Sequence, residues 1–354
     1  MRRGSLEMRE KIKNAVLRGA YSSGLHRIIS HLAGGAGTVL MLHRVVETKE
    51  ETPSRYLTVT SSFLEEVIFT IKQNNMIFVS LDEMLSILRS RRTSRHRFVA
   101  LTFDDGYRDN LTLALPILRS HGIPFAVFVP SGAPDRSMDV WFLRLERILM
   151  QLSCAEIGSG RNRRTLRLES PAQKAIAYEY CIHLAQQDLS AFKLWLNDLL
   201  PESAVGSFDL MNEHFLSWDE LRELSVDPLV TIGGHTVSHP MLARLPQDEA
   251  YHEIEAGRDR LASALGKPIL HFAYPFGDPL ACGARDFELA KRAGFESAVT
   301  TRYGNIYRWH RQHLHSLPRM TLGGPAERIA DTLLDVSGTR TFFSRKCFAP
   351  PATA

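Results

Sequence analysis

The sequence predicts an α/β protein built from parallel strand–helix units. Apolar runs such as 98–103 and 124–129 show no polar alternation, which is typical of strands buried on both faces. Amphipathic helical segments separate these runs and are long enough to act as crossover connections between parallel strands. At 354 residues, one barrel-like domain with insertions fits the length as well as two domains do.

Residues 8–33 are expected to form one amphipathic helix that ends at the glycine-rich run 34–37. Its apolar positions are Ile12, Val16, Ala20, Leu25, Ile28, Ile29 and Leu32, and its basic positions are Arg9, Lys11, Lys13, Arg18 and Arg27. Such a helix either docks on its own domain or lies on an anionic membrane surface. Residues 1–37 are therefore predicted to form an N-terminal segment ahead of the main domain.

The main domain is expected to span residues 38–339. Its elements are predicted in this order: strand 38–42, helix 62–75, strand 77–81, helix 82–89, strand 98–103, helix 111–121, strand 124–129, strand 230–234, helix 247–265, strand 272–274, helix 284–294 and strand 297–301. Residues 141–203 interrupt the alternation and are predicted to be a helical insertion in one loop. Residues 340–354 are expected to be a frayed tail.

The bulk composition is that of an ordinary globular protein, with 44% hydrophobic and 23% charged residues. The net charge of +4 is too weak to indicate nucleic-acid binding, although it would assist approach to an anionic sugar or membrane surface. The four cysteines show no C-x-x-C pairing, which argues against a disulfide framework. Without a secretory leader pattern or an apolar run of ~20 residues, the expected location is cytoplasmic.

Two adjacent acids, Asp104 and Asp105, stand where an apolar strand gives way to Gly106. This position lies at the carboxyl end of a parallel strand, where active sites of such folds are built. Successive side chains of extended backbone point in different directions, so one acid can bind a metal while the other faces a substrate. An ordinary turn is the alternative explanation for the Asp-Asp-Gly run.

Two histidines, His235 and His239, follow another apolar strand and the glycine pair 233–234. Their spacing places both imidazoles on one face of a helical turn, where they can hold one ion. Together with Asp105 they form a set of two imidazoles and one carboxylate, which suits a divalent transition metal with open positions. A second carboxylate beside such a metal, here that of Asp104, is typical of a metallohydrolase.

The run 102–106 combined with the run 235–239 resembles the motifs of the polysaccharide deacetylases of the carbohydrate esterase group. This family includes the nodulation-type chitooligosaccharide deacetylases. The resemblance covers about residues 38–325 without the insertion. It implies a distorted (β/α) barrel of the glycoside hydrolase/deacetylase type and a metal, by default zinc, bound by Asp105, His235 and His239. It also implies that Asp104 is the general base.

A third motif of that family, Arg-x-Pro-Tyr/Phe-Gly, occurs here at 273–277 as Ala-Tyr-Pro-Phe-Gly. The resemblance implies that the backbone N–H of Phe276 contacts the developing oxyanion. The motif arginine that orients the base is missing, because Ala273 takes its place. Arg319, at the end of a late strand, is the candidate that supplies this guanidinium from elsewhere.

The family's usual C-terminal strand, which ends in Leu-x-Leu-His, has no match after Thr301. Residues 40–43 match it instead, so the chain resembles the circularly permuted members of the family. A closed barrel tolerates permutation because its termini lie close together. On this interpretation His43 is the general acid, and a core or capping histidine is the alternative.

Aromatic and histidine residues outside these motifs are less decisive. Trp141 is expected either to line a sugar groove or to pack under the insertion. His310, His313 and His315 lie in a polar stretch and are expected to be surface residues, not ligands.

The sequence thus predicts a metal-dependent hydrolase that removes N-acetyl groups from an N-acetylated sugar or oligosaccharide. Two alternatives stay open: a deacetylase of a lipid-linked or nucleotide-linked aminosugar or an O-acetyl esterase, and a non-catalytic carbohydrate-binding barrel, which Ala273 favours. No nucleic-acid partner is expected. A peripheral contact of the N-terminal helix with the inner face of a membrane is a further expectation.

Overall fold

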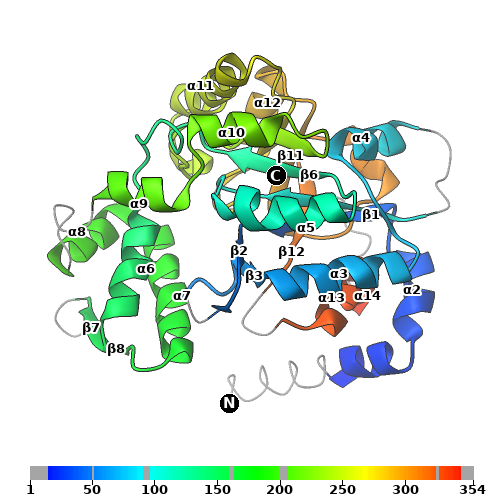
Figure 1. Cartoon of the computed structure of the whole chain (residues 1–354), viewed down its shortest axis with the longest axis horizontal. Coiled ribbons are helices and arrows are strands. Elements are labelled where there is room, and N and C mark those ends of the chain that lie inside the picture. Colours follow the sequence, from blue (N-terminus) through cyan, green and yellow to red (C-terminus); the bar gives the residue numbers. More distant parts are fainter. Residues whose placement is uncertain are drawn as a thin grey trace.

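The computed structural model describes residues 15–49, 52–90, 96–158, 163–199, 206–323 and 327–343. Within these ranges, seven parallel strands form a closed barrel surrounded by helices (Figure 1). In order around the barrel they are β1 (Gly37–Leu42), β5 (Phe98–Phe103), β6 (Phe125–Val129), β9 (Val230–Gly234), β10 (His271–Ala273), β11 (Ser297–Tyr303) and β12 (Leu317–Thr321). The barrel closes because β1 pairs with both β5 and β12. The predicted (β/α) barrel is confirmed.

The strands are buried along almost their whole length, which explains their continuous apolar runs. One apolar cluster lies between the barrel and its helices and includes Leu40, Leu101 and Val127. A second cluster contains the alternate residues Val39, Ala100 and Phe128, together with helix α4 (Leu81–Arg89). Because alternate residues of a strand face opposite sides, the second cluster fills the barrel interior.

The helices outside the barrel largely match the predicted segments. They are α3 (Ser61–Gln73), η2 (Asn110–Ala114), α5 (Leu115–Ser120), α10 (Trp218–Ser225), η4 (Leu242–Arg244), α11 (Gln247–Leu265), α12 (Ala284–Arg292), η5 (Arg308–Gln312), α13 (Ile329–Val336) and α14 (Thr339–Phe343). Hydroxyl side chains cap several of them: Thr60 accepts from the Phe63 amide, and Ser80 and Ser217 form capping boxes with Glu83 and Glu220.

Two strand features differ from the predictions. The expected strand 77–81 is only β4 (Ile77–Phe78), which pairs with β5 outside the barrel, because Ser80 already caps α4. A parallel pair, β2 (Arg44–Val46) and β3 (Thr58–Thr60), was not expected. Its strands have three residues each, too few to show a pattern in the sequence.

The chain between β6 and β9 forms a separate layer beside the barrel (Figure 1). It contains α6 (Trp141–Gln151), β7 (Cys154–Ile157), β8 (Arg164–Arg167), α7 (Pro171–Gln187), α8 (Leu189–Leu199) and α9 (Ser207–His214). An apolar cluster of its own, which includes Leu145, Tyr178 and Leu196, holds these helices together. The β7–β8 hairpin was missed because the segment was expected to be mostly helical. The division into domains stays a prediction.

Both ends of the chain correct the sequence analysis. The expected helix 8–33 is broken: residues 15–22 are helical, Gly24 adopts a left-handed conformation with φ of 72°, and α2 (Leu25–Ala33) starts afresh. Residues 8–14 lie outside the described residues. The expected tail from 340 is wrong as far as Phe343, because Thr339 and Thr341 are buried in α14, which packs against α2. No helix of the described chain is long and apolar enough to cross a bilayer.

Circular permutation stays a prediction. The barrel strands follow one another around the barrel in chain order, and His43 stands directly after β1, between β5 and β12. This arrangement brings the residue after β1 to the same rim as the residues after β5.

Candidate active site

Asp104 and Asp105 leave the carboxyl end of β5 in different directions. Asp104 continues the inward-facing series of Ala100 and Thr102, so its side chain points into the barrel. Asp105 has a φ of 74°, and Gly106 follows with a φ of 70°. This left-handed turn directs the Asp105 carboxylate towards the loop after β9. Both carboxylates are buried.

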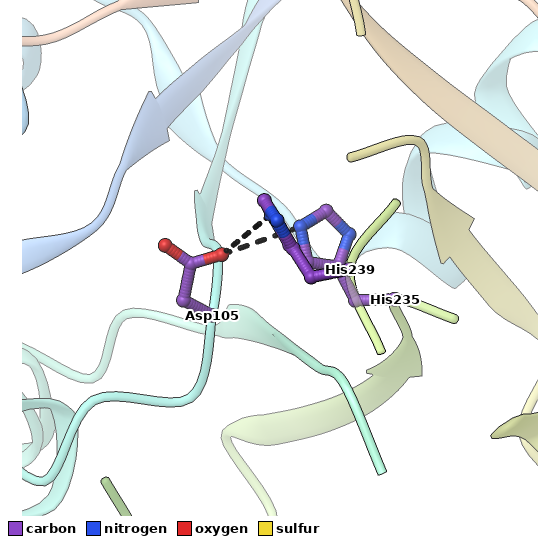
Figure 2. A group of neighbouring side chains, drawn as sticks. All are labelled: Asp105, His235 and His239. Atoms are coloured by element: carbon purple, nitrogen blue, oxygen red, sulfur yellow. Dashed lines mark ion pairs between the residues drawn. The ribbon is translucent and has the colours of Figure 1, made fainter. Parts of the chain in front are cut away.

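The Asp105 carboxylate meets both predicted histidines (Figure 2). Its Oδ1 lies 3.4 Å from His235 Nε2 and 3.2 Å from His239 Nε2. One ligand atom from each of the three residues lies within 4.8 Å of the others, and the described chain contains no second cluster of this kind. The structure therefore brings the three predicted ligands together.

The donor set fits a divalent cation. His235 Nδ1 lies 2.6 Å from the Ala273 carbonyl oxygen, which can only accept, so the Nδ1–H donates and Nε2 faces Asp105, where the neutral ring can offer its lone pair to a cation. Asp105 Oδ1 is buried and has no hydrogen-bond donor among the described residues. A buried carboxylate oxygen facing two imidazole nitrogens matches the ligands of a two-histidine, one-carboxylate site.

Electrostatics keep Asp105 in its anionic form. Burial by itself raises the pKa of Asp105, but the adjacent His235 and His239 imidazoles outweigh it and hold the pKa well below the ordinary value. The carboxylate is therefore ionised at neutral pH, which is the state that ligates a cation.

Arg319 contacts Asp104, as the sequence analysis suggested. Two guanidinium nitrogens donate to the two carboxylate oxygens, Nη1 to Oδ1 at 2.7 Å and Nη2 to Oδ2 at 2.6 Å. Arg319 also donates from Nε to the Thr300 carbonyl oxygen at 3.0 Å and from Nη1 to the Thr102 hydroxyl at 3.1 Å. The side chain crosses the barrel interior from β12, so a residue far from motif position 273 reaches Asp104.

This contact sets the charge of Asp104. Burial raises the pKa of the carboxyl, but the paired Arg319 guanidinium outweighs burial and lowers it below the ordinary value. Asp104 is thus an ionised carboxylate held in one orientation by a planar, two-point contact. A carboxylate in this state can accept a proton.

Phe276 lies in a strained turn at the carboxyl end of β10. Its φ is 59°, and the Thr301 hydroxyl donates to its carbonyl oxygen at 2.6 Å. The Phe276 ring packs on His239, with centroids 5.1 Å apart, and the residue lines the same pocket as the metal cluster. Its backbone N–H donates to no described residue. The N–H is therefore free to donate to a bound molecule.

His43 lines this pocket together with the two aspartates. Its carbonyl oxygen accepts a hydrogen bond from Asn110 Nδ2 at 2.9 Å, which fixes the backbone, while its Nδ1 is buried and has no partner among the described residues. Burial lowers the pKa of His43, with the nearby Asp105 and Asp104 carboxylates acting against it. The structure thus places His43 at the pocket with an unpartnered buried nitrogen among the described residues, and its role as general acid stays a prediction.

Backbone strain is concentrated at this site. The described chain has six residues other than glycine with positive φ, and four of them are Asp105, Thr236, His239 and Phe276. Such conformations cost of order 1–3 kcal/mol each and persist only where the surroundings impose them. The local conformations that the site requires are thus held by the rest of the fold.

The insertion builds one wall of the pocket. The pocket has a volume of about 270 Å³, and α6 and α7 supply part of its lining. Trp141 both lines the pocket and packs on Phe142 and Phe192, so the two expectations for this residue hold together. The α7 residues Tyr178, Glu179, Ile182 and Gln186 also line it. Sequence reasoning missed them because their helical spacing resembles that of any packed helix.

A buried ionic network connects this wall to the rim of the barrel. Arg44, next to His43, donates to Glu146 of α6 at 3.2 Å and lies 3.6 Å from Asp109. Burial raises the pKa of Asp109 to about 6, although the Arg44 charge acts against it. The network joins the loops after β1 and β5 to the insertion, so the wall has a fixed position relative to the catalytic residues.

Comparison with known proteins identifies the family of the chain. The polysaccharide deacetylase family model matches residues 91–164 and 173–298, more than half of the chain. The chain belongs to the polysaccharide deacetylase family. This deacetylase is therefore a hydrolase of the carbohydrate esterase type, and the family implies an N-acetylated carbohydrate as its substrate. No curated protein sequence matches the chain.

Solved structures show the same fold. The deacetylase PplD of Streptococcus pyogenes, solved with acetate, is 19% identical, with a TM-score of 0.56 over 84% of this chain and 97% of that one. IcaB from Ammonifex degensii is 19% identical, with a TM-score of 0.53 over 86% and 97%. BC0361, a polysaccharide deacetylase from Bacillus cereus, is 15% identical, with a TM-score of 0.52 over 84% and 68%.

Proposed function

We propose that this deacetylase removes acetyl groups from the amino groups of an N-acetylated sugar or oligosaccharide and depends on a divalent cation held by Asp105, His235 and His239. One observation carries the proposal: the three donor atoms lie within 4.8 Å of one another, directly beside an ionised carboxylate that Arg319 holds in place. A cation at this position would act as a Lewis acid on the acetyl carbonyl and lower the pKa of water.

Asp104 is the base in this proposal. Its carboxylate is ionised, and the residue is next to the metal ligand Asp105 in sequence. Arg319 donates hydrogen bonds to both carboxylate oxygens, which prevents the carboxylate from rotating. It would take the proton of the attacking water, a role that contributes ~10²–10⁴ in rate. Arg319 touches no substrate here; it positions the base and keeps it charged.

Two further groups serve the opposite ends of the scissile amide. The Phe276 N–H, which donates to no described residue, would stabilise the charge that develops on the acetyl oxygen, a contribution of ~10²–10³ in rate. His43 would give a proton to the departing sugar nitrogen, because an unprotonated amine anion is a poor leaving group. Both groups border the pocket that contains the metal ligands.

The pocket favours a sugar as the group that enters. At about 270 Å³ it is near the lower end of ligand pockets, which commonly measure ~300–1,000 Å³. Its wall offers Trp141, Phe142 and Tyr178, whose aromatic rings can pack against the apolar faces of a sugar ring. The half-buried Glu179, whose pKa burial raises, is the acid on that wall.

The alternative of a non-catalytic carbohydrate-binding barrel has lost its support. Ala273 favoured it, because that residue replaces the arginine of the family motif. The contact of Arg319 with Asp104 supplies an equivalent guanidinium from β12. The second candidate, a deacetylase of a lipid-linked or nucleotide-linked aminosugar, differs only in the group attached to the sugar.

An acetate-release screen of purified enzyme tests the proposal with free, nucleotide-linked and lipid-linked N-acetylated sugars as substrates. Wild type should release acetate from at least one of these N-acetylated substrates. Asp104→Asn should lose at least ~10²-fold in turnover while keeping its metal. Asp219→Asn, which changes an exposed aspartate on α10, is the matched control and should act as wild type. Near-normal activity of Asp104→Asn would show that another group is the base.

A further inference from the structure

A second pocket of the described chain lies at the opposite end of the barrel from the active site. It has a volume of about 630 Å³. Its residues precede strands: α2 leads into β1, Met76 stands before β4, and Arg97 stands before β5. Because the strands are parallel, these residues gather at the amino ends, whereas the active site lies at the carboxyl ends. Figure 1 shows α2 and the insertion on opposite sides of the barrel.

This pocket is lined by basic and neutral polar groups. His26, Arg27, His31, His96 and Arg97 all contribute to its wall, and no acidic residue is among those that line it. Neither arginine forms an ion pair within the described chain. Such a wall is complementary to an anion.

Arg97 is the buried part of this wall. Its Nη2 donates to the carbonyl oxygens of Gly34 and Val336, which fixes the guanidinium between α2 and α13. Its Nε is buried without a hydrogen-bond partner among the described residues. Burial without a carboxylate lowers the pKa of Arg97 to about 10. A buried guanidinium that has no carboxylate partner and an unpaired Nε–H is typical of a binding site for an anionic group.

Helix α2 carries an apolar row beside the pocket. Leu25, Ile28 and Leu32 are 41%, 62% and 74% exposed and share one face of the helix, while Ile29 and Ala33 are buried against the protein. Arg27 and His31 occupy the remaining side, towards the pocket, and the buried His26 borders the pocket from the packed face. The helix therefore has three faces: one packed, one basic and one apolar in solvent.

Neighbouring segments add to both the exposed apolar surface and the positive charge around α2. Val16 of the preceding helical segment and Phe342 and Phe343 of α14, which packs against α2, are also exposed. In sequence, residues 1–33 contain seven lysines and arginines and only two acidic residues. An exposed apolar row combined with a strong positive charge is characteristic of a helix that lies in the interface of an anionic bilayer.

We infer that this end of the deacetylase binds an anionic phospholipid membrane. The apolar row of Leu25, Ile28 and Leu32 enters the interface, and the pocket around Arg27 and Arg97 accepts a lipid phosphate. Docking in this way leaves the active-site pocket open to the aqueous side, so a bound enzyme would reach glycans that extend away from the lipid surface. The inference does not depend on the proposed reaction.

Vesicle co-sedimentation of the full chain tests this inference. Wild type should sediment with vesicles that contain phosphatidylglycerol, sediment much less with phosphatidylcholine alone, and dissociate as salt rises. Ile28→Ser combined with Leu32→Ser should weaken binding roughly tenfold or more, because two apolar side chains leave the interface. Arg27→Glu should weaken it by about fivefold or more, since each nearby charge contributes on this scale.

Matched variants elsewhere provide the controls. Val226→Ser combined with Leu280→Ser removes two equally exposed apolar side chains, and Lys291→Glu reverses an exposed charge. These variants should bind vesicles as wild type does, and all variants should keep the melting temperature and acetate release of wild type. Equal vesicle binding by Ile28→Ser/Leu32→Ser and wild type would overturn the inference.

Two other occupants of this surface would give different results. If the pocket takes a soluble phosphorylated ligand, calorimetry with inorganic phosphate would detect binding that Arg27→Glu abolishes. In that case wild type would not bind vesicles. If the apolar row joins two copies of the chain, light scattering would show an oligomer that Ile28→Ser/Leu32→Ser dissociates, again without vesicle binding. Either result overturns the membrane inference, and a monomer that binds anionic vesicles supports it.

Discussion

At the scale of single residues, the site depends on how one buried pair is arranged. Arg319 and Asp104 are both almost completely buried, and Arg319 donates two hydrogen bonds to the Asp104 carboxylate. Removing one partner of such a pair costs more than the pair contributes, because the other charge stays buried without compensation, a penalty of ~3–5 kcal/mol. The pair should therefore govern both the stability of the rim and the charge of the base.

Replacing Arg319 by methionine tests this role. Arg319 is the strongest of the groups that oppose the effect of burial on Asp104, so without the guanidinium the pKa of Asp104 should rise and the acid limb of kcat/KM should move to higher pH. Turnover should fall by roughly 10²-fold. Arg319→Lys keeps the charge but loses the two-point contact, and should be intermediate. An acid limb that stays in place in Arg319→Met would show that Arg319 does not set the charge of the base. Arg222→Met, an exposed arginine, is the control.

His310 corrects the sequence analysis and yields a prediction on stability. It was expected at the surface, but it is buried: its Nδ1 accepts the Tyr307 amide at 2.8 Å, and its ring stacks on Trp309 at 3.7 Å. Burial lowers its pKa from 6.5 to about 4. Between these values the unfolded chain binds a proton that the folded chain does not, so this group destabilises the fold as pH falls through that window.

Urea unfolding of wild type and His310→Asn from pH 7 to pH 4 measures the effect. The asparagine oxygen can still accept the Tyr307 amide but does not titrate. The difference in unfolding free energy between wild type and variant should therefore change by roughly 3 kcal/mol across this range, with wild type losing more. A constant difference would mean that His310 is protonated at the same pH in both states. His313→Asn, a nearby histidine, is the control.

The candidate residues could be predicted from the sequence only where they are close in sequence to a recognisable motif. Asp104, Asp105, His235 and His239 stand in short runs after apolar strands, and the structure brings them together. Arg319 could only be suggested, because its contact with Asp104 depends on barrel closure, which places β12 two strands from β5. Its role, like that of His43 and Phe276, stays a prediction.

At the scale of elements, the insertion supplies part of the lining of the active-site pocket. Helices α6 and α7 form one wall of the pocket, and the Arg44–Glu146 contact joins this wall to the rim. The wall is built from side chains that do not take part in the reaction. Changes in it should therefore alter substrate binding more than the chemical step.

Two isoleucines of α7 provide a matched test. Ile182 lines the pocket, whereas Ile176 on the same helix is 71% exposed. Ile182→Ala should raise KM for the preferred substrate by roughly tenfold with little change in kcat, since it removes contact made equally in ground and transition states. Ile176→Ala should leave both constants unchanged. Identical KM values for the two variants, measured by acetate release, would show that α7 does not contact the substrate.

The elements themselves were predictable where the pattern was long and continuous. The barrel strands and α3, α11 and α12 lie within a few residues of their predicted ranges. The short pairs β2–β3 and β7–β8 were not predicted, because three or four residues are too few to show a periodic pattern of apolar residues. The predicted helix 8–33 was wrong because Gly24 has a positive φ, which breaks an otherwise continuous apolar pattern.

At the scale of the whole molecule, barrel closure creates both functional ends. It brings the loops after β5 and β9 to one rim, so that Asp105 meets histidines about 130 positions away in sequence. It also leaves the α2 pocket at the opposite end. Because the two surfaces lie at opposite ends, substrate binding and the inferred membrane contact need not compete. The cellular compartment stays a prediction.

The central claim is that Asp105, His235 and His239 hold one cation on which deacetylation depends. The most direct test is metal content by elemental analysis, measured together with acetate release, for wild type, Asp105→Asn and the control Asp219→Asn. We expect about one divalent ion per chain in wild type and control, loss of the ion and of turnover in Asp105→Asn, and loss of wild-type turnover on chelation with recovery when metal is returned. Full turnover of metal-free enzyme, or undiminished metal in Asp105→Asn, would contradict the account.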